Sequence, residues 1–225
     1  MNTELAILTI GAVPVGDIKN MLTEQLTEHQ CRHICLLGGM SRPQVEAEYG
    51  YQEGDKQFFT LLEDKQIVCL SREKVERALA RAVDVLEKQG ISVILLLSSS
   101  RFESLKSQHA MLLESERIIP PLVASIVEGH QVGVVVPVEE LLPHQRTKWQ
   151  GLDNDPLFIL ANPLAEDDDS FLDAGRKLVN RGADVIVLDS AGYRVKHRDL
   201  LQKTLDIPVL LSSSLLTRLA SELVV

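Results

Sequence analysis

Long apolar runs are missing from this 225-residue chain. A helix needs about 20 consecutive apolar residues to cross a bilayer. The N-terminus also lacks the basic segment, apolar segment and small-residue cleavage site of a secretory signal. These absences favour a cytoplasmic protein without a membrane partner. Because 45% of the residues are hydrophobic, the chain has enough apolar side chains for a globular core.

An excess of positive charge is missing too. The formal net charge is -9, whereas proteins that bind nucleic acid usually carry a basic face. We therefore expect no nucleic-acid partner. Because net negative charge repels an anionic ligand, local cations must supply the attraction. The candidate cations follow predicted strand ends, and they are Arg42, Arg101 and Arg194.

The chain has few cysteines, and their spacing matches no paired-cysteine motif. The chain has Cys31, Cys35 and Cys69, an odd number without a Cys-x-x-Cys motif. This pattern argues against a disulfide framework and against a zinc ribbon. We read the three thiols as small, buried hydrophobic groups. The histidines form no metal-ligand spacing either, so we expect neither a metal nor another cofactor.

Two stretches of the chain share one pattern. Gly90–Ser100 aligns without gaps with Gly182–Gly192, and each runs from a glycine through apolar residues into a small polar cluster. Short apolar runs with these boundaries are typical of strands buried in a parallel sheet. Each follows an amphipathic helical pattern. Two such copies predict an α/β fold of two halves, with a pseudo-twofold axis as the simplest relation between them.

The remaining segments predict where the halves begin and end. Residues 58–62 and 66–70 predict a β-hairpin, and the polar residues 101–116 predict a helix. The pair Pro120–Pro121 is the expected crossover into the second half. A last strand at 208–211 has no partner left there, so we expect it to return to the first half. The predicted domains are 1–117 plus 206–225, with the hairpin inserted at 57–70, and 118–205.

Ligands of open parallel sheets bind at the carboxyl ends of the strands. Ser98 and Ser190 lie at two such ends, and if the halves face each other, both hydroxyls would line one central cleft. Consecutive N–H groups and hydroxyls bind carboxylate or phosphate, although a capped loop without a ligand explains the same residues. Turns at other strand ends are also candidates. The expected ligand contacts are Gly11, Ala12, Pro14, Arg42, Ser99, Ser100, Arg101, Pro137, Val138, Glu139, Ala191, Gly192 and Tyr193.

Three titratable residues surround Ser190 in sequence. Asp189 points to the opposite side from Ser190 if the strand stays extended. Tyr193 and His197 fit either acid–base chemistry or a buried structural role, and we favour the structural one.

A family resemblance is carried by five segments: Leu5–Gly11, Lys74–Arg77, Ile119–Val123, Val132–Glu140 and Gly182–Asp189. These segments resemble the AroM family, whose name links it to aromatic amino-acid biosynthesis, and the chain is also similar to the aspartate/glutamate racemase superfamily. The resemblance implies two flavodoxin-like halves with parallel sheets, facing a cleft that holds a small carboxylate. It also implies a cysteine after the central strand of each half, one removing the α-proton as thiolate and the other donating a proton.

Both matching cysteine positions are serine here, at Ser98 and Ser190. A thiol is partly ionised at neutral pH, whereas a hydroxyl needs an adjacent base or metal. We therefore expect no two-cysteine racemase, but the hydroxyls remain able to donate hydrogen bonds to a carboxylate or enolate. The leading hypothesis is a carboxylate-binding protein with cofactor-free isomerase or lyase chemistry. The alternative is a non-catalytic metabolite-binding or regulatory protein linked to aromatic amino-acid metabolism. A homodimer is left open.

Overall fold

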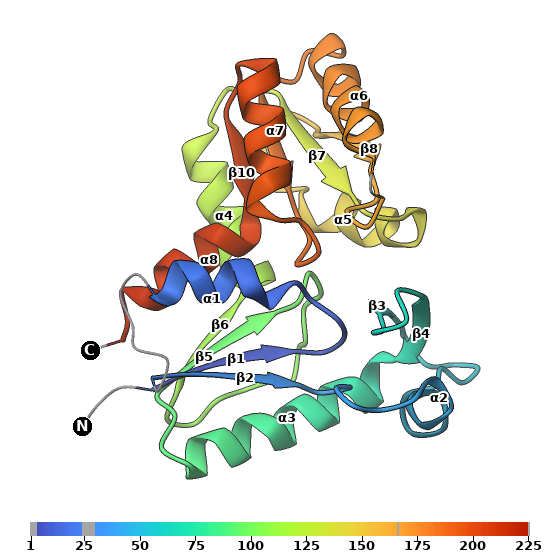
Figure 1. Cartoon of the computed structure of the whole chain (residues 1–225), viewed down its shortest axis with the longest axis vertical. Coiled ribbons are helices and arrows are strands. Elements are labelled where there is room, and N and C mark those ends of the chain that lie inside the picture. The colour runs from blue at the N-terminus through green and yellow to red at the C-terminus, as the bar shows by residue number, and fades with distance from the viewer. Residues whose placement is uncertain (1–3, 24–29, 166, 225) are drawn as a thin grey trace. The chain divides into compact units, whose positions relative to one another are not determined.

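The computed structural model describes residues 4–23, 30–165 and 167–224 (Figure 1). The chain divides into two compact units. Unit 1 comprises Met1–Val13, Lys19–Glu114 and Thr217–Val225, and unit 2 comprises Pro14–Ile18 and Ser115–Leu216. In helix α1 (Val15–Thr23), residues 15–18 group with unit 2 and residues 19–23 with unit 1. Each unit contains a four-stranded parallel sheet.

Unit 1 has the strand order β2-β1-β5-β6 and an antiparallel hairpin, β3–β4, inserted before its long helix α3. Figure 1 shows α3 lying along one face of the sheet. The hairpin confirms the sequence prediction. The elements are β1 (Leu5–Thr9), β2 (Cys31–Cys35), α2 (Arg42–Tyr49), β3 (Gln57–Leu61), β4 (Ile67–Ser71), α3 (Arg72–Lys88), β5 (Val93–Leu97) and β6 (Met111–Glu114).

Unit 2 repeats this connectivity with the strand order β8-β7-β9-β10. The strands of the two sheets correspond in order: β8 matches β2, β7 matches β1, β9 matches β5, and β10 matches β6. The elements are α4 (Ser115–Ile126), β7 (Val132–Val136), the 3-10 helix η2 (Glu139–Leu141), α5 (Leu142–Lys148), β8 (Leu157–Leu160), α6 (Asp168–Asn180), β9 (Val185–Leu188), α7 (Val195–Leu205), β10 (Val209–Leu211) and α8 (Ser212–Ser221).

The repeated helix, glycine and strand pattern is confirmed. All residues of β5 and β9 are buried, and each strand has a neighbour on both sides. The preceding helices also end alike: Gly90 and Gly182 have φ values of +86° and +100°. The N–H of the residue after each glycine donates to the carbonyl of Leu86 or Leu178, at 3.1 and 3.0 Å. Glycine therefore stops both helices in the left-handed conformation that such caps require.

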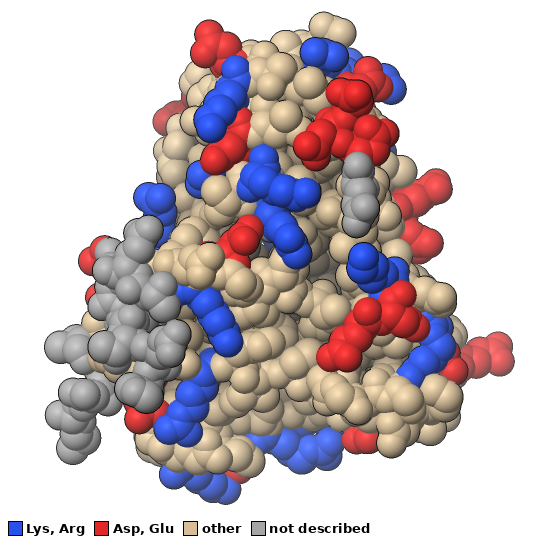
Figure 2. All heavy atoms as spheres, viewed as in Figure 1, with Lys and Arg blue, Asp and Glu red and all other residues tan. Residues whose placement is uncertain are grey.

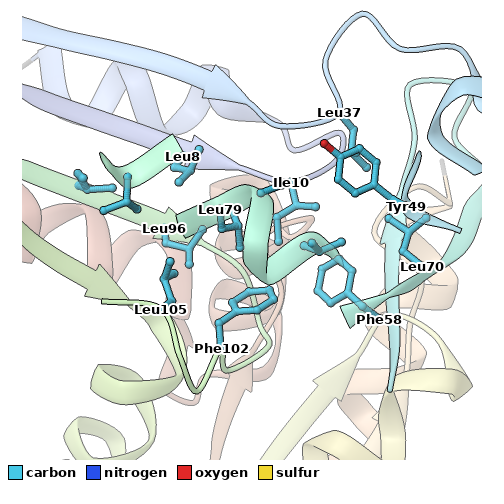
Figure 3. Close-up of a cluster of buried hydrophobic side chains, with 14 of the residues drawn as sticks. Leu8, Ile10, Leu37, Tyr49, Phe58, Leu70, Leu79, Leu96, Phe102 and Leu105 are labelled. Atoms are coloured by element: carbon cyan, nitrogen blue, oxygen red, sulfur yellow. The ribbon is translucent and has the colours of Figure 1, made fainter. Parts of the chain in front are cut away.

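The hairpin extends the core of unit 1. Figure 3 shows Phe58 and Leu70 of the hairpin beside Tyr49 of α2, all part of the buried cluster that includes Leu79 and Leu96. The Phe58 ring also lies 5.7 Å from the ring of Phe102, in the loop after β5. Burial of these side chains holds the hairpin against the sheet.

The helix predicted at 101–116 is wrong. A loop follows β5 and leads into β6, and α4 begins only at Ser115. The loop is held by the carboxylate of Glu87, which accepts hydrogen bonds from the N–H groups of His109 (2.6 Å) and Ala110 (2.8 Å). These bonds align residues 111–114 as a strand beside β5.

The expected return of the last strand to the first half is also wrong. Strand β10 pairs with β9, because β6 occupies the place beside β5. Of the C-terminal residues, only Thr217–Val225 group with unit 1. Pro120 and Pro121 lie inside α4 rather than in a crossover loop. Among the helices that the structure describes, none is long and apolar enough to cross a membrane.

The two helix-ending glycines give a testable prediction. Gly90→Ala or Gly182→Ala places a Cβ on a backbone with positive φ, so each change should lower the free energy of unfolding by about 1 kcal/mol. Gly151→Ala is the control, because Gly151 has no positive φ and no neighbouring atom within 4 Å of its added Cβ. Urea unfolding measures all three. Equal stability of the Gly182→Ala and Gly151→Ala proteins would contradict the conformational argument.

Candidate functional site

The serine loops after the two central strands have the same local geometry. The hydroxyl oxygen of Ser98 accepts a hydrogen bond from the N–H of Ser100, and that of Ser190 accepts one from the N–H of Gly192, both at 3.2 Å. Because each oxygen acts as an acceptor here, the hydroxyl proton stays available to donate elsewhere. Ser98 is 9% exposed and Ser190 is half-buried. Two hydroxyl donors are thus fixed at equivalent strand ends.

An exposed arginine follows each serine loop. Arg101 and Arg194 are exposed, and within the described ranges neither takes part in an ion pair. Ser99, Ser100, Ala191 and Gly192 are partly exposed. On the face drawn in Figure 2, acidic and basic side chains are interspersed, so single cations rather than a continuous basic surface supply positive charge. These two arginines are the cations best placed to attract an anion to the loops.

Arg42 forms two ion pairs within unit 1. Its Nη1 lies 3.3 Å from Glu46 and its Nε lies 3.4 Å from Asp64, in the turn of the hairpin. The guanidinium therefore links α2 to the hairpin. Only its Nη2 is buried without a hydrogen-bond partner in the described part of the chain.

The turn after β1 is covered by the hairpin. A Cβ on Gly11 would lie 2.1 Å from the carbonyl oxygen of Leu61, and the N–H of Ala12 donates to that same oxygen at 2.8 Å. Glycine is required here by the close approach of the β3 backbone. Pro14 is partly exposed just before α1. The structure thus gives Gly11 and Ala12 a packing role.

The turn after β7 lies at the same sheet edge as the Ser190 loop. Strands β7 and β9 are parallel neighbours, so their carboxyl ends meet at that edge. Pro137 and Val138 are partly exposed there, and Glu139 is exposed at the start of η2. This turn is therefore well placed to contact a ligand bound at Ser190.

Asp189, the residue before Ser190, takes part in a buried ion pair. The Nζ of Lys148 is 2.8 Å from Oδ2 of Asp189, and the two side chains are 0% and 1% exposed. Asp189 Oδ1 accepts a hydrogen bond from the hydroxyl of Ser212 at 2.9 Å. Gln145 makes a long 3.5 Å contact to the Asp189 carbonyl and accepts a 2.8 Å bond from Trp149 Nε1. As expected from strand geometry, Asp189 points into the protein while Ser190 is partly exposed.

Sequence reasoning missed the partners of Asp189. An acid at the end of a fully buried strand signals that a partner must exist, because an unpaired buried charge is very unfavourable. Nothing in the short helix 142–148 distinguishes Lys148 from its exposed neighbours Arg146 and Thr147.

The Tyr193 and His197 side chains have structural roles. The Tyr193 hydroxyl donates to the carbonyl of Ala161 at 2.8 Å, and burial, together with the negative charge of Asp189, raises its pKa. His197 Nδ1 accepts the N–H of Arg194 at 3.0 Å, and the ring stacks 4.9 Å from Phe171. Burial, with the nearby Lys196 and Arg194, lowers the pKa of His197 to about 4. His197 is thus a neutral cap of α7.

The arrangement supplies hydrogen-bond donors rather than a strong base. Neither serine hydroxyl has a carboxylate or imidazole partner among the hydrogen bonds of the described residues. The part of the chain that the structure describes contains no group of three side chains able to hold a metal ion. Burial raises the pKa of the Cys31 and Cys69 thiols, which disfavours ionised sulfur. The serine loops are therefore suited to binding an anion and to stabilising negative charge on it.

Comparison with known proteins gives a family and a fold. A family model described as AroM protein matches residues 5–224. No curated protein matches the sequence. An aspartate racemase homologue from Pyrococcus horikoshii OT3 has a similar structure, with a TM-score of 0.60 and 13% identity, covering 98% of each chain.

Two further solved structures share the fold. Glutamate racemase isoform RacE1 from Bacillus anthracis has a TM-score of 0.61 and 12% identity, covering 98% of this chain and 81% of that one. Unliganded arylmalonate decarboxylase has a TM-score of 0.55 and 11% identity, covering 98% of this chain and 91% of that one. The racemase-like two-domain fold expected from the sequence is confirmed.

The lowered pKa of His197 predicts a loss of stability in acid. The unfolded chain binds the proton near pH 6.5, whereas the folded protein binds it only near pH 4. Stability is therefore fully present above about pH 6.5 and falls by up to about 3 kcal/mol as the pH drops to 4. His197→Gln keeps an acceptor for the Arg194 N–H but cannot take a charge, so this part of the loss should disappear.

Urea unfolding between pH 7.5 and 4 measures the effect. His109→Gln is the matched control, because His109 has an exposed side chain. If the wild type and the His197→Gln protein lose stability in parallel over this range, the assignment of a buried, neutral imidazole is wrong.

Proposed function

Because the chain belongs to the AroM protein family, we propose that it binds a small carboxylate-bearing metabolite through the serine loops that follow β5 and β9. The observation that carries this proposal is the matched geometry of Ser98 and Ser190. Each hydroxyl oxygen is held by the N–H of the second residue after it. The oriented donor on each loop suits a hydrogen bond to a carboxylate oxygen.

The charges near the loops support an anionic ligand. Arg101 and Arg194 each follow a serine loop and are exposed. A charge-assisted bond to either guanidinium would attract a carboxylate despite the net charge of -9. The similar structures also support an anionic ligand. Their names are those of enzymes whose substrates carry carboxylates: an aspartate racemase homologue, a glutamate racemase and an arylmalonate decarboxylase.

The chemistry that fits best is cofactor-free isomerisation or lyase chemistry next to the carboxylate. Removing a proton or carbon dioxide from the adjacent carbon moves an electron pair onto the carboxylate oxygens. Hydroxyl and N–H donors that meet these oxygens stabilise the negative charge as it forms. In this proposal Ser98 and Ser190 stabilise the enolate, and neither is the base.

A specific observation favours a second candidate function. Both serine hydroxyls lack a basic side-chain partner in the described part of the chain, and a hydroxyl without a base is a poor proton acceptor. A protein with this site would bind the metabolite without converting it and would act as a metabolite sensor or regulator linked to aromatic amino-acid metabolism.

Thermal melting tests the binding. The ligands are dicarboxylates, 2-oxo acids, shikimate-pathway acids and aromatic amino acids, each with its amide as a neutral comparison. At 100 times the dissociation constant a ligand adds about 2.7 kcal/mol, which should raise the melting temperature of a chain this size by about 5 to 10 °C. Ser98→Ala and Ser190→Ala should each weaken binding about 10- to 100-fold, because each removes a hydrogen bond to a charged group.

Ser125→Ala is the control, since the exposed Ser125 hydroxyl bonds only within α4. The proposal fails if no carboxylate shifts the melting temperature, or if the Ser125→Ala protein is impaired as much as the other two. For a ligand that binds, exchange of its α-hydrogen with deuterium from the solvent separates the two functions. Exchange that is lost in the Ser98→Ala or Ser190→Ala protein supports the enzyme, and binding without exchange supports the sensor.

A further inference from the structure

The two serine loops differ at one position. In the gapless alignment of the repeats, the residue before Ser98 is Leu97, and the residue before Ser190 is Asp189. Both side chains are buried, at 4% and 1% exposure. Unit 1 therefore fills this position with an apolar group. Unit 2 places a carboxylate there and must compensate its charge.

The compensation comes from within unit 2. Lys148 reaches Asp189 from the last turn of α5, and the hydroxyl of Ser212 donates to the other carboxylate oxygen. The Nζ of Lys148 also lies 5.8 Å from the centre of the Trp149 ring. Both charges are thus enclosed by protein, where screening by solvent and salt is weak.

Stability alone is a poor explanation for this pair. Replacing a buried ion pair with apolar groups of similar volume is often neutral or stabilising, because taking both charges out of water is unfavourable. The chain itself uses an apolar residue at the matching position, Leu97. A charge at position 189 therefore points to a role in the electrostatics or geometry of the loop that follows.

We propose that Lys148 is a positioning residue for the Ser190 loop: its ammonium cancels the charge of Asp189 and so permits an anion to bind at Ser190. This inference deepens, and rests on, the proposed carboxylate-binding function. Consecutive Cα atoms are only 3.8 Å apart, so an uncompensated Asp189 would repel any anion held by the Ser190 hydroxyl.

An introduced thiol measures the electrostatic potential at this site without any ligand. Ser190→Cys is made in the full chain, alone and combined with Lys148→Met, Asp189→Asn, or both. The rate of alkylation by iodoacetamide from pH 5 to 10 gives the thiol pKa, because only the thiolate reacts. Peptide mass spectrometry separates the introduced thiol from Cys31, Cys35 and Cys69.

The expected shifts have opposite signs. Lys148→Met should raise the thiol pKa by about one pH unit, and Asp189→Asn should lower it by a similar amount. Alkylation at pH 7 would then be about tenfold slower or faster than with Ser190→Cys alone. The protein carrying both changes should return close to the starting value. A purely structural role would change the limiting rate at high pH, through access, and leave the pKa in place.

Shifts of the same sign, or shifts under about 0.3 pH unit, would overturn the inference. If the Lys148→Met protein does not fold, the Asp189→Asn protein decides, because the inference requires a lower thiol pKa there. The readout involves no metabolite. If no carboxylate in the melting screen binds, the proposed function is wrong. The thiol pKa measurement would still test the role of Lys148 separately.

Discussion

A strand inside a parallel sheet is covered on both faces, and this constraint governs the rest of the structure. Strands β5 and β9 are buried along their whole lengths. Such strands carry apolar residues, so polar groups able to meet a ligand are displaced to the carboxyl ends. The chain meets the constraint twice in the same way, with a helix stopped by a left-handed glycine, a buried strand and a serine loop.

Much of the fold follows from local pattern. The strands within 90–100 and 182–192 and the hairpin could be predicted, because apolar runs and their turn residues lie within the segments themselves. The sheet neighbour of β10 could not be predicted. Strand β6 is only four residues long, and its pairing with β5 depends on the Glu87 carboxylate, which is distant in sequence.

The candidate site was predictable to a similar degree. The serine loops follow from the repeat, and their matched hydrogen bonds agree with that reading. Long-range contacts determine the surroundings of the other candidate residues, and these contacts could not be predicted from the sequence. Arg42 pairs with Asp64, and the β3 backbone covers Gly11. The Lys148–Asp189 pair joins residues from α5 and from the end of β9, and no spacing rule connects them. Local sequence therefore locates the loops, and tertiary packing sets their electrostatics.

The central claim is that the serine loops after β5 and β9 bind carboxylates. A titration of ¹⁵N-labelled protein with malonate, followed through the amide signals of Ser100 and Gly192, tests it most directly. These N–H groups donate to the two serine hydroxyl oxygens, so a ligand at those hydroxyls must change their chemical shifts. The account predicts that both signals move with malonate and that neither moves with malonamide. Movement in only one loop, or equal movement with malonamide, would contradict it.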